Sequence, residues 1–307
     1  MANKRTLYGY ISIVLAVILW GASFVWSKEL LNSHFGVFTI LSCRIVIACL
    51  ALMIIFLPNR KIERIRKGDY KLFFTLALFE PFLYFLGENF GLKYVSSSFA
   101  AMIVALIPIF VALTMHFVFK DILKKELIIG VFASIFGVVL MSMGSSTGET
   151  SIKGVLLLSL AVLTAAAYTV SLQTLIKRGY GPVSITFWQN ALALVYFIPC
   201  FFIFDFSHIS EYLWTPNNIF NLVCLGVLCS AGAYAFYSNA ARLLSITKIS
   251  IFTNIIPVIT IILAVSIGQE SLTLMKSTGI VIAVLGVIFS QSSVLSKNKT
   301  KSNINES

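Results

Sequence analysis

Ten long apolar stretches restrict what this chain can fold into more than any other feature. A helix that crosses the hydrocarbon core of a bilayer needs about 20 mainly apolar residues. Hydrophobic residues make up 58% of the chain and charged residues 11%, with a mean hydropathy of +0.94, so a soluble class is excluded. We predict an all-α integral membrane protein with ten transmembrane helices. The predicted spans are Leu7–Trp26, Phe35–Leu57, Leu72–Gly91, Ser96–Phe119, Leu127–Gly144, Gly154–Ile176, Val183–Phe204, Ile219–Ala241, Ile249–Ile267 and Ser277–Ser293.

The spans form two groups of five, separated by a short polar break at Ser145–Lys153. Because five is odd, the second group must enter the membrane from the side opposite to the first. The chain is therefore predicted to contain two inverted repeats, residues 7–144 and 154–293, and a polar, disordered cytoplasmic tail at residues 294–307. Inverted repeats are typical of secondary transporters, whose substrate site lies near the middle of the membrane.

A weak internal alignment supports the repeat. An offset of 145 places Arg44 on Gln189, and an offset of 150 places Tyr84 on Tyr234 and Glu80 on Ser230. Prolines and glycines carry most of the weight, because identities among apolar residues arise easily by chance. At an offset of 149 the matching pairs are Ser96 and Ser245, Ile107 and Ile256, Pro108 and Pro257, Gly130 and Gly279, and Gly137 and Gly286.

The positive charge is distributed unevenly between the two faces of the predicted bundle. With a cytoplasmic N-terminus, eighteen lysines and arginines fall on the cytoplasmic side, four fall outside, and Arg44 lies within the membrane. This asymmetry is the positive-inside pattern of a plasma or inner membrane protein, and it predicts that both termini are cytoplasmic. The net charge of +11 is therefore explained by the loops on the cytoplasmic side of the membrane, and it does not indicate nucleic-acid binding.

Other functional signatures are absent from the sequence. The first span is too long for a signal peptide and lacks a cleavage segment, so we expect it to remain. The five cysteines lie within spans, with no CxxC pair or metal-ligand spacing, and are interpreted as small apolar side chains. No phosphate-binding loop, metal cluster or nucleophile elbow is present, and no cofactor is expected.

Several short motifs follow one another along the chain: Trp20-Gly21-Ala22-Ser23-Phe24, Arg44 with Ala48, Gly91-Leu92-Lys93-Tyr94-Val95-Ser96 through Ile107-Pro108, and Pro257 with Gly268-Gln269-Glu270. In this order and spacing they resemble the EamA-type proteins of the drug/metabolite transporter superfamily. The resemblance covers residues 7–293 and implies ten helices in two repeats, cytoplasmic termini, and export or exchange of small metabolites. Two positions depart from the pattern: Lys120-Asp121 replaces a usual Gly-Glu, and Ala165 replaces a frequent tryptophan.

Arg44 and Glu80 are the foremost candidates for a transport site. Each lies roughly 12–14 Å into a hydrocarbon core about 30 Å thick, on consecutive antiparallel helices, so we expect them to be partners. A charge at this depth is costly and usually faces a cavity. Glu80 would hold a substrate ammonium or a coupling proton, and Arg44 would balance that charge or bind a carboxylate. The alternative is a permanent ion pair that fixes packing.

The helix that carries Glu80 has further polar positions. Pro81 removes a backbone donor and predicts a kink. Glu80, Tyr84, Gly87 and Gly91 are expected to share one face. Glu88 lies near the outer end, as an entry residue or merely a solvated one. Asn89 is expected to bond across helices, and His116, in the next span, is expected at the cytoplasmic interface.

The second repeat offers neutral polar groups, so we expect a cavity with one charged wall and one neutral aromatic wall. Such a cavity suits an amphipathic small organic molecule, and aromatic rings in it can stack on the ligand or its cation. The paired glycines of the fifth and tenth spans predict close helix contact. The candidate substrate-binding residues are Glu80, Arg44, Tyr84, Trp20, Glu88, Tyr168, Gln189, Asn190, Tyr234 and Asn254.

The leading hypothesis is a secondary transporter that exports or exchanges small amino-acid-like or drug-like metabolites, coupled to protons through Glu80. A carrier of phosphorylated or nucleotide-linked metabolites is the alternative within transport, although it would need more cavity cations than Arg44. From other classes, an intramembrane enzyme lacks a nucleophile with a base, and a receptor or scaffold leaves the inverted repeat unexplained. The expected partners are a small substrate and the lipid bilayer; monomer and homodimer both remain open.

Overall fold

A computed structural model of the chain describes residues 2–56, 58, 62–111, 125–143, 151–244, 249 and 252–304. The elements of the first repeat are α1 (Ala2–Asn32), α2 (Val37–Phe56), α3 (Tyr70–Ala77), η1 (Leu78–Leu83), α4 (Tyr84–Leu92), α5 (Ser97–Val104) and α7 (Lys125–Met143). The elements of the second repeat are α8 (Ile152–Lys177), α9 (Pro182–Phe204), η2 (Phe206–Glu211), α10 (Pro216–Cys224), η3 (Leu225–Ala233), α11 (Tyr234–Leu243), α13 (Ile256–Ser266) and α14 (Leu274–Ile304).

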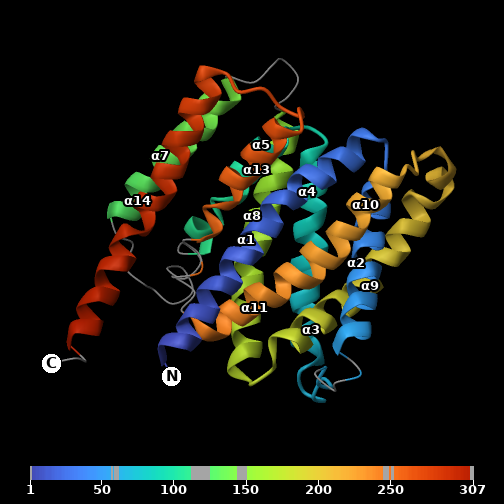
Figure 1. Ribbon diagram of the computed structural model, residues 1–307, viewed down its shortest axis with the longest axis horizontal. Helices are drawn as coiled ribbons and strands as arrows, with labels where there is room; N and C mark the ends of the chain where they lie inside the picture. Colours follow the sequence, from blue (N-terminus) through green and yellow to red (C-terminus); the bar gives the residue numbers. More distant parts are fainter. Residues whose placement is uncertain are drawn as a thin grey trace.

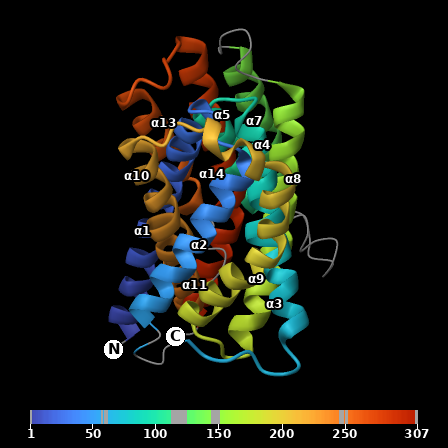
Figure 2. The same cartoon turned by 90° about the vertical axis from the view of Figure 1, so that its right-hand side faces the viewer.

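The described residues form an all-helical bundle, as predicted. Six helical segments are long and apolar enough to cross a membrane, and four shorter apolar helices lie at 97–111, 128–141, 256–266 and 274–289. Together these ten segments fall on the ten predicted spans, and the all-α membrane fold with two five-helix repeats is confirmed. Both chain ends lie at the same end of the bundle (Figures 1 and 2).

The two repeats interlock and do not form separate halves. The most extensive helix contacts each join one repeat to the other: α7 with α14, α2 with α9, α4 with α8, and α1 with α11. Figure 1 shows α1 running beside α11 and α13, and the α7–α14 pair set to one side of the other helices. The space between α1, α2, α4, α8 and α11 is therefore walled by both repeats.

The third and eighth spans are each interrupted at the same place in their repeat. In both, a π-helical turn, η1 or η3, separates two α-helical halves. The kink at Pro81 was predicted, but the interruption in η3 was not, because that segment contains no proline. Shorter breaks at Ala105-Leu106 and Asn254-Ile255 also obey the offset of 149. In both of these a proline follows within the next few residues, and proline removes a backbone donor and disfavours helix before it.

Glycines hold α7 and α14 together at backbone distance, which confirms the predicted close contact. A Cβ atom added to Gly137 would lie 2.4 Å from the backbone nitrogen of Ala283, and one added to Gly279 would lie 2.5 Å from that of Met141. Gly286 approaches the backbone of Ser134 in the same way. Such approach is possible only without side chains and is a common device for packing helices in lipid.

One end of the bundle is joined by a clasp between the α2–α3 and α8–α9 connections, which we call the basic-end clasp. Asp69 accepts a hydrogen bond from Tyr180 Oη at 2.8 Å and forms an ion pair with Arg178. Arg66 donates its backbone N–H to Tyr180 Oη at 2.9 Å and its guanidinium to the Arg178 carbonyl at 3.0 Å. Two loops predicted to lie on the same side of the membrane are thus in direct contact.

The opposite end has a clasp with the roles of the repeats exchanged. Asp205, at the end of α9, accepts hydrogen bonds from the backbone N–H of Thr39 at 2.8 Å and from its hydroxyl at 3.1 Å. Phe35 stacks on Tyr212 with ring centroids 5.1 Å apart. An aspartate of each repeat therefore binds the other repeat: Asp69 binds the α8–α9 connection, and Asp205 binds the first turn of α2.

A second contact at this opposite end links the α13–α14 turn to the start of α5. Gly268 has a φ of +75°, a conformation that favours glycine, and it turns Gln269 and Glu270 toward the bundle. Glu270 accepts the backbone N–H of Ser98 at 2.8 Å and pairs with Lys276 at 2.8 Å. The carboxylate thereby satisfies a free N–H at the helix start of the other repeat.

The helix α14 continues past Ser293 to Ile304, into the segment expected to be a disordered tail. Once a helix is nucleated, each further residue adds one hydrogen bond, and this segment contains neither glycine nor proline. Polar composition therefore led us to expect disorder in a segment where the structure has a helix up to Ile304.

Candidate transport cavity

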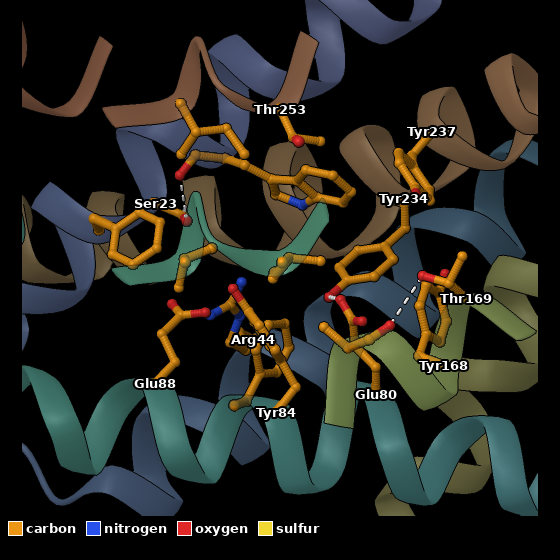
Figure 3. A pocket seen from close by; sticks show the side chains of 17 residues that line it. Ser23, Arg44, Glu80, Tyr84, Glu88, Tyr168, Thr169, Tyr234, Tyr237 and Thr253 are labelled. Atoms are coloured by element: carbon orange, nitrogen blue, oxygen red, sulfur yellow. Dashed lines mark hydrogen bonds between the residues drawn. The ribbon is translucent and has the colours of Figure 1, made fainter. Parts of the chain in front are cut away.

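A cavity lies in the centre of the bundle, between the two interrupted helices. About 60 Å³ of it is open to the centres of water-sized molecules, and about 630 Å³ is free of protein atoms when the open solvent at its mouth is included. Figure 3 shows its labelled polar side chains pointing inward from both repeats. The lining residues are Trp20, Ser23, Phe24, Arg44, Glu80, Tyr84, Phe85, Glu88, Val104, Ile107, Ala165, Tyr168, Thr169, Tyr234, Tyr237, Thr253 and Ile256.

Glu80 lies in the interruption of the third span and is buried. Its backbone is extended, with φ −149° and ψ 121°, so its side chain does not follow the helical face of the residues before and after it. The Tyr234 hydroxyl, from the second repeat, donates a hydrogen bond to Glu80 Oε1 at 2.5 Å. The two interrupted helices are thus joined at their midpoints by this bond.

Arg44 is 1% exposed, and its partners are not those we expected. Its Nε donates to the Ser230 hydroxyl at 2.9 Å, and its guanidinium carbon lies 3.9 Å from the centroid of the Phe85 ring. The ion pairs of the described residues do not include Arg44 with Glu80. The expectation that these two residues are partners is therefore wrong, because the extended backbone at Glu80 directs its carboxylate toward α11.

Glu88 is 2% exposed and lines the cavity, which contradicts its interpretation as a solvated residue. Within the regular helix α4, Tyr84 and Glu88 are four residues apart and share a face, and both project toward Arg44 (Figure 3). The charge of Arg44 acts electrostatically on Glu88. One helix turn thus places a second carboxylate beside the arginine.

Aromatic rings form the rest of the wall. Trp20 lies edge-on to Tyr234 and tilted to Tyr237, with ring centroids 5.2 and 5.1 Å apart. Tyr168 is perpendicular to Tyr234 at 6.4 Å. Interlocked rings of this kind hold one another in fixed orientations, so the cavity wall opposite the charged groups is shaped by aromatic packing.

Seven of the ten predicted site residues line the cavity, and Gln189, Asn190 and Asn254 do not. Gln189 lies behind the wall, where its Oε1 accepts a hydrogen bond from Tyr168 at 3.3 Å. Asn190 donates to the Ser230 carbonyl at 3.1 Å. Asn254 is buried beside the break before α13. Gln189 and Asn190 therefore support residues that contact the cavity or Arg44.

Other expectations for this region turned out differently. Gly87 and Gly91 pack against α8 and do not extend the face of Glu80. Asn89 donates to the Phe85 carbonyl of its own helix at 3.0 Å, and not across helices. His116 and the Lys120-Asp121 pair lie outside the described residues.

Several cavity residues were missed by the sequence analysis, notably Ser23, Phe85, Thr169 and Tyr237. Ser23 and Phe24 belong to the Trp20-Gly21-Ala22-Ser23-Phe24 motif, and Trp20 and Phe24 are four residues apart on one face. Thr169 and Tyr237 follow Tyr168 and Tyr234 by one residue and by nearly one turn. Extending each candidate to its helical neighbours would have found most of them.

Among the described residues, no group of three or more His, Cys, Asp or Glu side chains could hold a metal ion. The cavity offers charged groups, hydrogen-bonding groups and aromatic surface. It can bind a small organic molecule with polar ends, and its ionisable groups are shielded from water by both repeats.

The interlocked repeats, interrupted helices and buried polar cavity together have the architecture of a multi-pass membrane transporter. The sequence model described as "EamA-like transporter family" matches residues 7–143 and 152–291. The chain therefore belongs to the EamA-like transporter family, and the predicted resemblance is confirmed.

Individual relatives agree with this assignment. The chain is 29% identical over 309 residues to "Uncharacterized transporter YcxC" of Bacillus subtilis (strain 168), covering 97% of both chains. It is 26% identical over 288 residues to an "Uncharacterized transporter" of Archaeoglobus fulgidus, covering 91% of this chain and 96% of the relative. A solved structure with 15% identity superposes with a TM-score of 0.68 over 96% of this chain and 98% of that one, which indicates a shared fold.

The family motif around Trp20 has a physical explanation in this structure. Trp20 and Phe24 face the cavity, whereas Gly21 faces α13, where an added Cβ would lie 2.7 Å from Ile259. The Gly21 carbonyl also accepts the Thr260 hydroxyl at 2.9 Å. The glycine therefore sets the distance between α1 and α13, and the aromatic residues beside it shape the cavity.

Proposed function

We propose that the chain is a secondary transporter that moves small amino-acid-like or drug-like organic molecules through the central cavity by alternating access. One observation carries the proposal: three buried ionisable side chains of the first repeat line a cavity whose other wall belongs to the second repeat. Burying charged groups in a membrane protein is costly, and such groups mark substrate or proton pathways.

The contacts between the repeats suit a rocking motion. Glu80 bonds Tyr234 and Arg44 bonds Ser230, so two of the three charged groups at the cavity contact the opposite repeat. Binding of a substrate or proton to either group competes with these contacts. Competition of this kind gives a ligand different affinities for two arrangements of the repeats, which is the requirement for a ligand-driven change of state.

Glu80 is proposed as the coupling site. Its partner is a neutral phenol, so its charge is not neutralised by a bound cation of the protein. An ammonium group of the substrate or a proton would each neutralise it, but not both together. This exclusivity supports exchange of substrate against protons, in the direction of export when the outside is more acidic.

We place the basic-end clasp on the cytoplasmic side. It contains Arg66 and Arg178, and the charge asymmetry of the chain places most lysines and arginines at this end. Both termini lie at the same end of the bundle (Figure 2). The proposed orientation therefore has cytoplasmic N- and C-termini in the plasma or inner membrane.

The test is flux through the purified protein in proteoliposomes, after a thermal-stabilisation screen against amino acids, nucleosides and cationic dyes. Glu80→Gln keeps the shape of the side chain and removes its charge. Because a hydrogen bond to a charged group contributes about 1.5–3 kcal/mol, we expect flux to fall about 10- to 100-fold. The variant should still insert and elute as a folded protein.

The matched control is Glu211→Gln, which changes an exposed carboxylate far from the cavity and should leave flux unchanged. Equal flux and equal pH dependence in Glu80→Gln and the native protein would remove Glu80 from the mechanism. Absence of flux for every screened compound in the native protein would contradict the transport assignment for these substrate classes.

A further inference from the structure

Arg44 and Glu88 carry opposite charges on the wall of one cavity, yet they do not bond to each other. We propose that this pair recognises a dipolar ligand, a short molecule that bears a carboxylate and an ammonium group, and that Ser230 and Phe85 are the residues that position Arg44 for this purpose. The proposal rests on the transport function above and chooses, within it, zwitterions over purely cationic molecules.

The surroundings of Arg44 leave one part of its guanidinium available. The Nε atom is occupied by Ser230 and one face by the Phe85 ring, whereas Nη1 is buried without a hydrogen-bond partner. A buried charged donor without a partner is expensive. Guanidinium groups bind carboxylates through parallel hydrogen bonds, so a ligand carboxylate is the chemistry that best satisfies this end of the cavity.

The surroundings of Glu88 show the complementary feature. Its Oε1 atom is buried without a partner, and the side chain is only 2% exposed. Among the ion pairs of the described residues, none joins Glu88 to Arg44, although the charge of Arg44 acts on it. An ammonium group placed beside Glu88 would supply the missing donor.

The two unpaired atoms lie on the same cavity wall, so one ligand can satisfy both. A ligand with only a positive charge would be attracted by Glu88 but repelled by Arg44. A ligand with only a negative charge would be attracted by Arg44 but repelled by Glu88. A zwitterion avoids both penalties, because each of its charges faces the opposite charge of the protein. Opposed penalties against single-charge ligands are an effective source of specificity.

The remainder of the cavity accommodates the rest of such a ligand. In this arrangement the ammonium lies beside Glu88, while Glu80, engaged by Tyr234, takes the coupling proton. The ammonium and that proton still exclude each other, because a nearby positive charge favours the ionised form of a carboxylate. The charged and titratable groups that line the cavity are Arg44, Glu80, Tyr84, Glu88, Tyr168, Tyr234 and Tyr237. The tyrosines, with Trp20, present aromatic surface that suits an apolar side chain on the zwitterion.

Ser230 belongs to the interrupted helix of the second repeat and is itself held in place. Its carbonyl accepts the side-chain amide of Asn190 at 3.1 Å, while its hydroxyl accepts Arg44 Nε. Ser230 is fully buried and does not line the cavity, so it acts through Arg44. This makes it a positioning residue and not a ligand contact.

The experiment measures thermal stabilisation and proteoliposome flux with the standard amino acids, each tested alone. For the amino acid that stabilises most, two relatives are compared: its amide, which lacks the carboxylate, and its deamino acid, which lacks the ammonium. We expect the native protein to bind each relative at least about tenfold more weakly, the effect of about 1.4 kcal/mol for one lost charged contact. This comparison uses only the native protein, so it is independent of any folding defect.

The variants then assign each preference to a residue. In Arg44→Gln the preference for the acid over its amide should disappear, and in Glu88→Gln the preference over the deamino acid should disappear. Ser230→Ala should raise the KM for the zwitterion with little effect on kcat, and Ser230→Thr, which keeps the hydroxyl, should restore it. A purely structural role would not produce these selective changes.

Two results would overturn the proposal. One is a native protein that binds the amide or the deamino acid as well as the zwitterion. The other is stabilisation by cationic dyes alone, with Glu80-dependent flux; in that case the transport function would stand and the dipolar assignment would fail.

Discussion

The two repeats of this protein share a scaffold but differ in the chemistry of their cavity walls. Each has an interrupted helix at the same position, η1 in the first repeat and η3 in the second. The first interruption carries Glu80 and Pro81, whereas the second carries Ser230 and no proline. The first repeat supplies Arg44, Glu80 and Glu88 to the cavity region, and the second answers with hydroxyl and aromatic groups.

Two repeats with the same fold can therefore form one cavity although the side chains on its two walls differ in chemistry. Two charged groups of the first repeat, Arg44 and Glu80, have their hydrogen-bond partners in the second, at Ser230 and Tyr234. Gln189, which corresponds to Arg44, makes only a neutral bond within its own repeat, with Tyr168. The first repeat therefore carries the ionisable side chains, and the second repeat supplies neutral hydrogen-bond partners to Arg44 and Glu80.

The largest expected effect comes from placing a charge in the wrong repeat. Gln189→Arg puts a guanidinium at a fully buried site where Gln189 bonds the neutral Tyr168 hydroxyl, so we expect about 3–5 kcal/mol of destabilisation. Thermal unfolding of the detergent-solubilised protein measures it. Gln189→Met is the control, because it loses only the bond with Tyr168, at about 1 kcal/mol. Equal melting temperatures for Gln189→Arg and the native protein would mean that the second repeat tolerates charge.

An intermediate effect is expected where the repeats are most alike, at the contact of α7 with α14. Gly279→Ala adds a Cβ atom 2.5 Å from the Met141 nitrogen, so the helices must separate, at a cost of about 1–3 kcal/mol. Gly68→Ala is the control, since no atom lies within 4 Å of its added Cβ. The two melting temperatures are compared in the same detergent. If both glycine substitutions had the same effect, backbone contact would not be what joins these helices.

The smallest effect concerns the basic-end clasp. The hydrogen bond from Tyr180, with the nearby Arg178 guanidinium, lowers the pKa of Asp69 below its ordinary value. The ionised carboxylate therefore stabilises the fold above the ordinary aspartate pKa of about 3.9, and this contribution is lost as the pH falls through the lower folded-state pKa. We expect a small part of the acid sensitivity of the melting temperature to disappear in Asp69→Asn. An unchanged profile between pH 7 and pH 3 would show that the basic-end clasp does not depend on this charge.

Much of the architecture could be predicted from the sequence because it depends on local length and periodicity. The ten spans follow from the apolar runs, and the repeat follows from their number and from the prolines and glycines that both halves share. The residues at the cavity were largely predictable as well. Arg44 and Glu80 are ionisable residues at mid-membrane depth, and such residues usually face the interior of the helix bundle or a cavity in it.

What the sequence by itself determined was therefore the membrane fold, the inverted repeat and the charged character of the first repeat. Only the tertiary structure decided which groups meet: Glu80 with Tyr234, Arg44 with Ser230 and Phe85, and Glu88 on the cavity wall. The physical reason is that an interrupted helix loses the 100° periodicity that relates its side chains. Past such a break, the direction of a side chain depends on how the other repeat packs, and that information is distributed over residues far away in the chain.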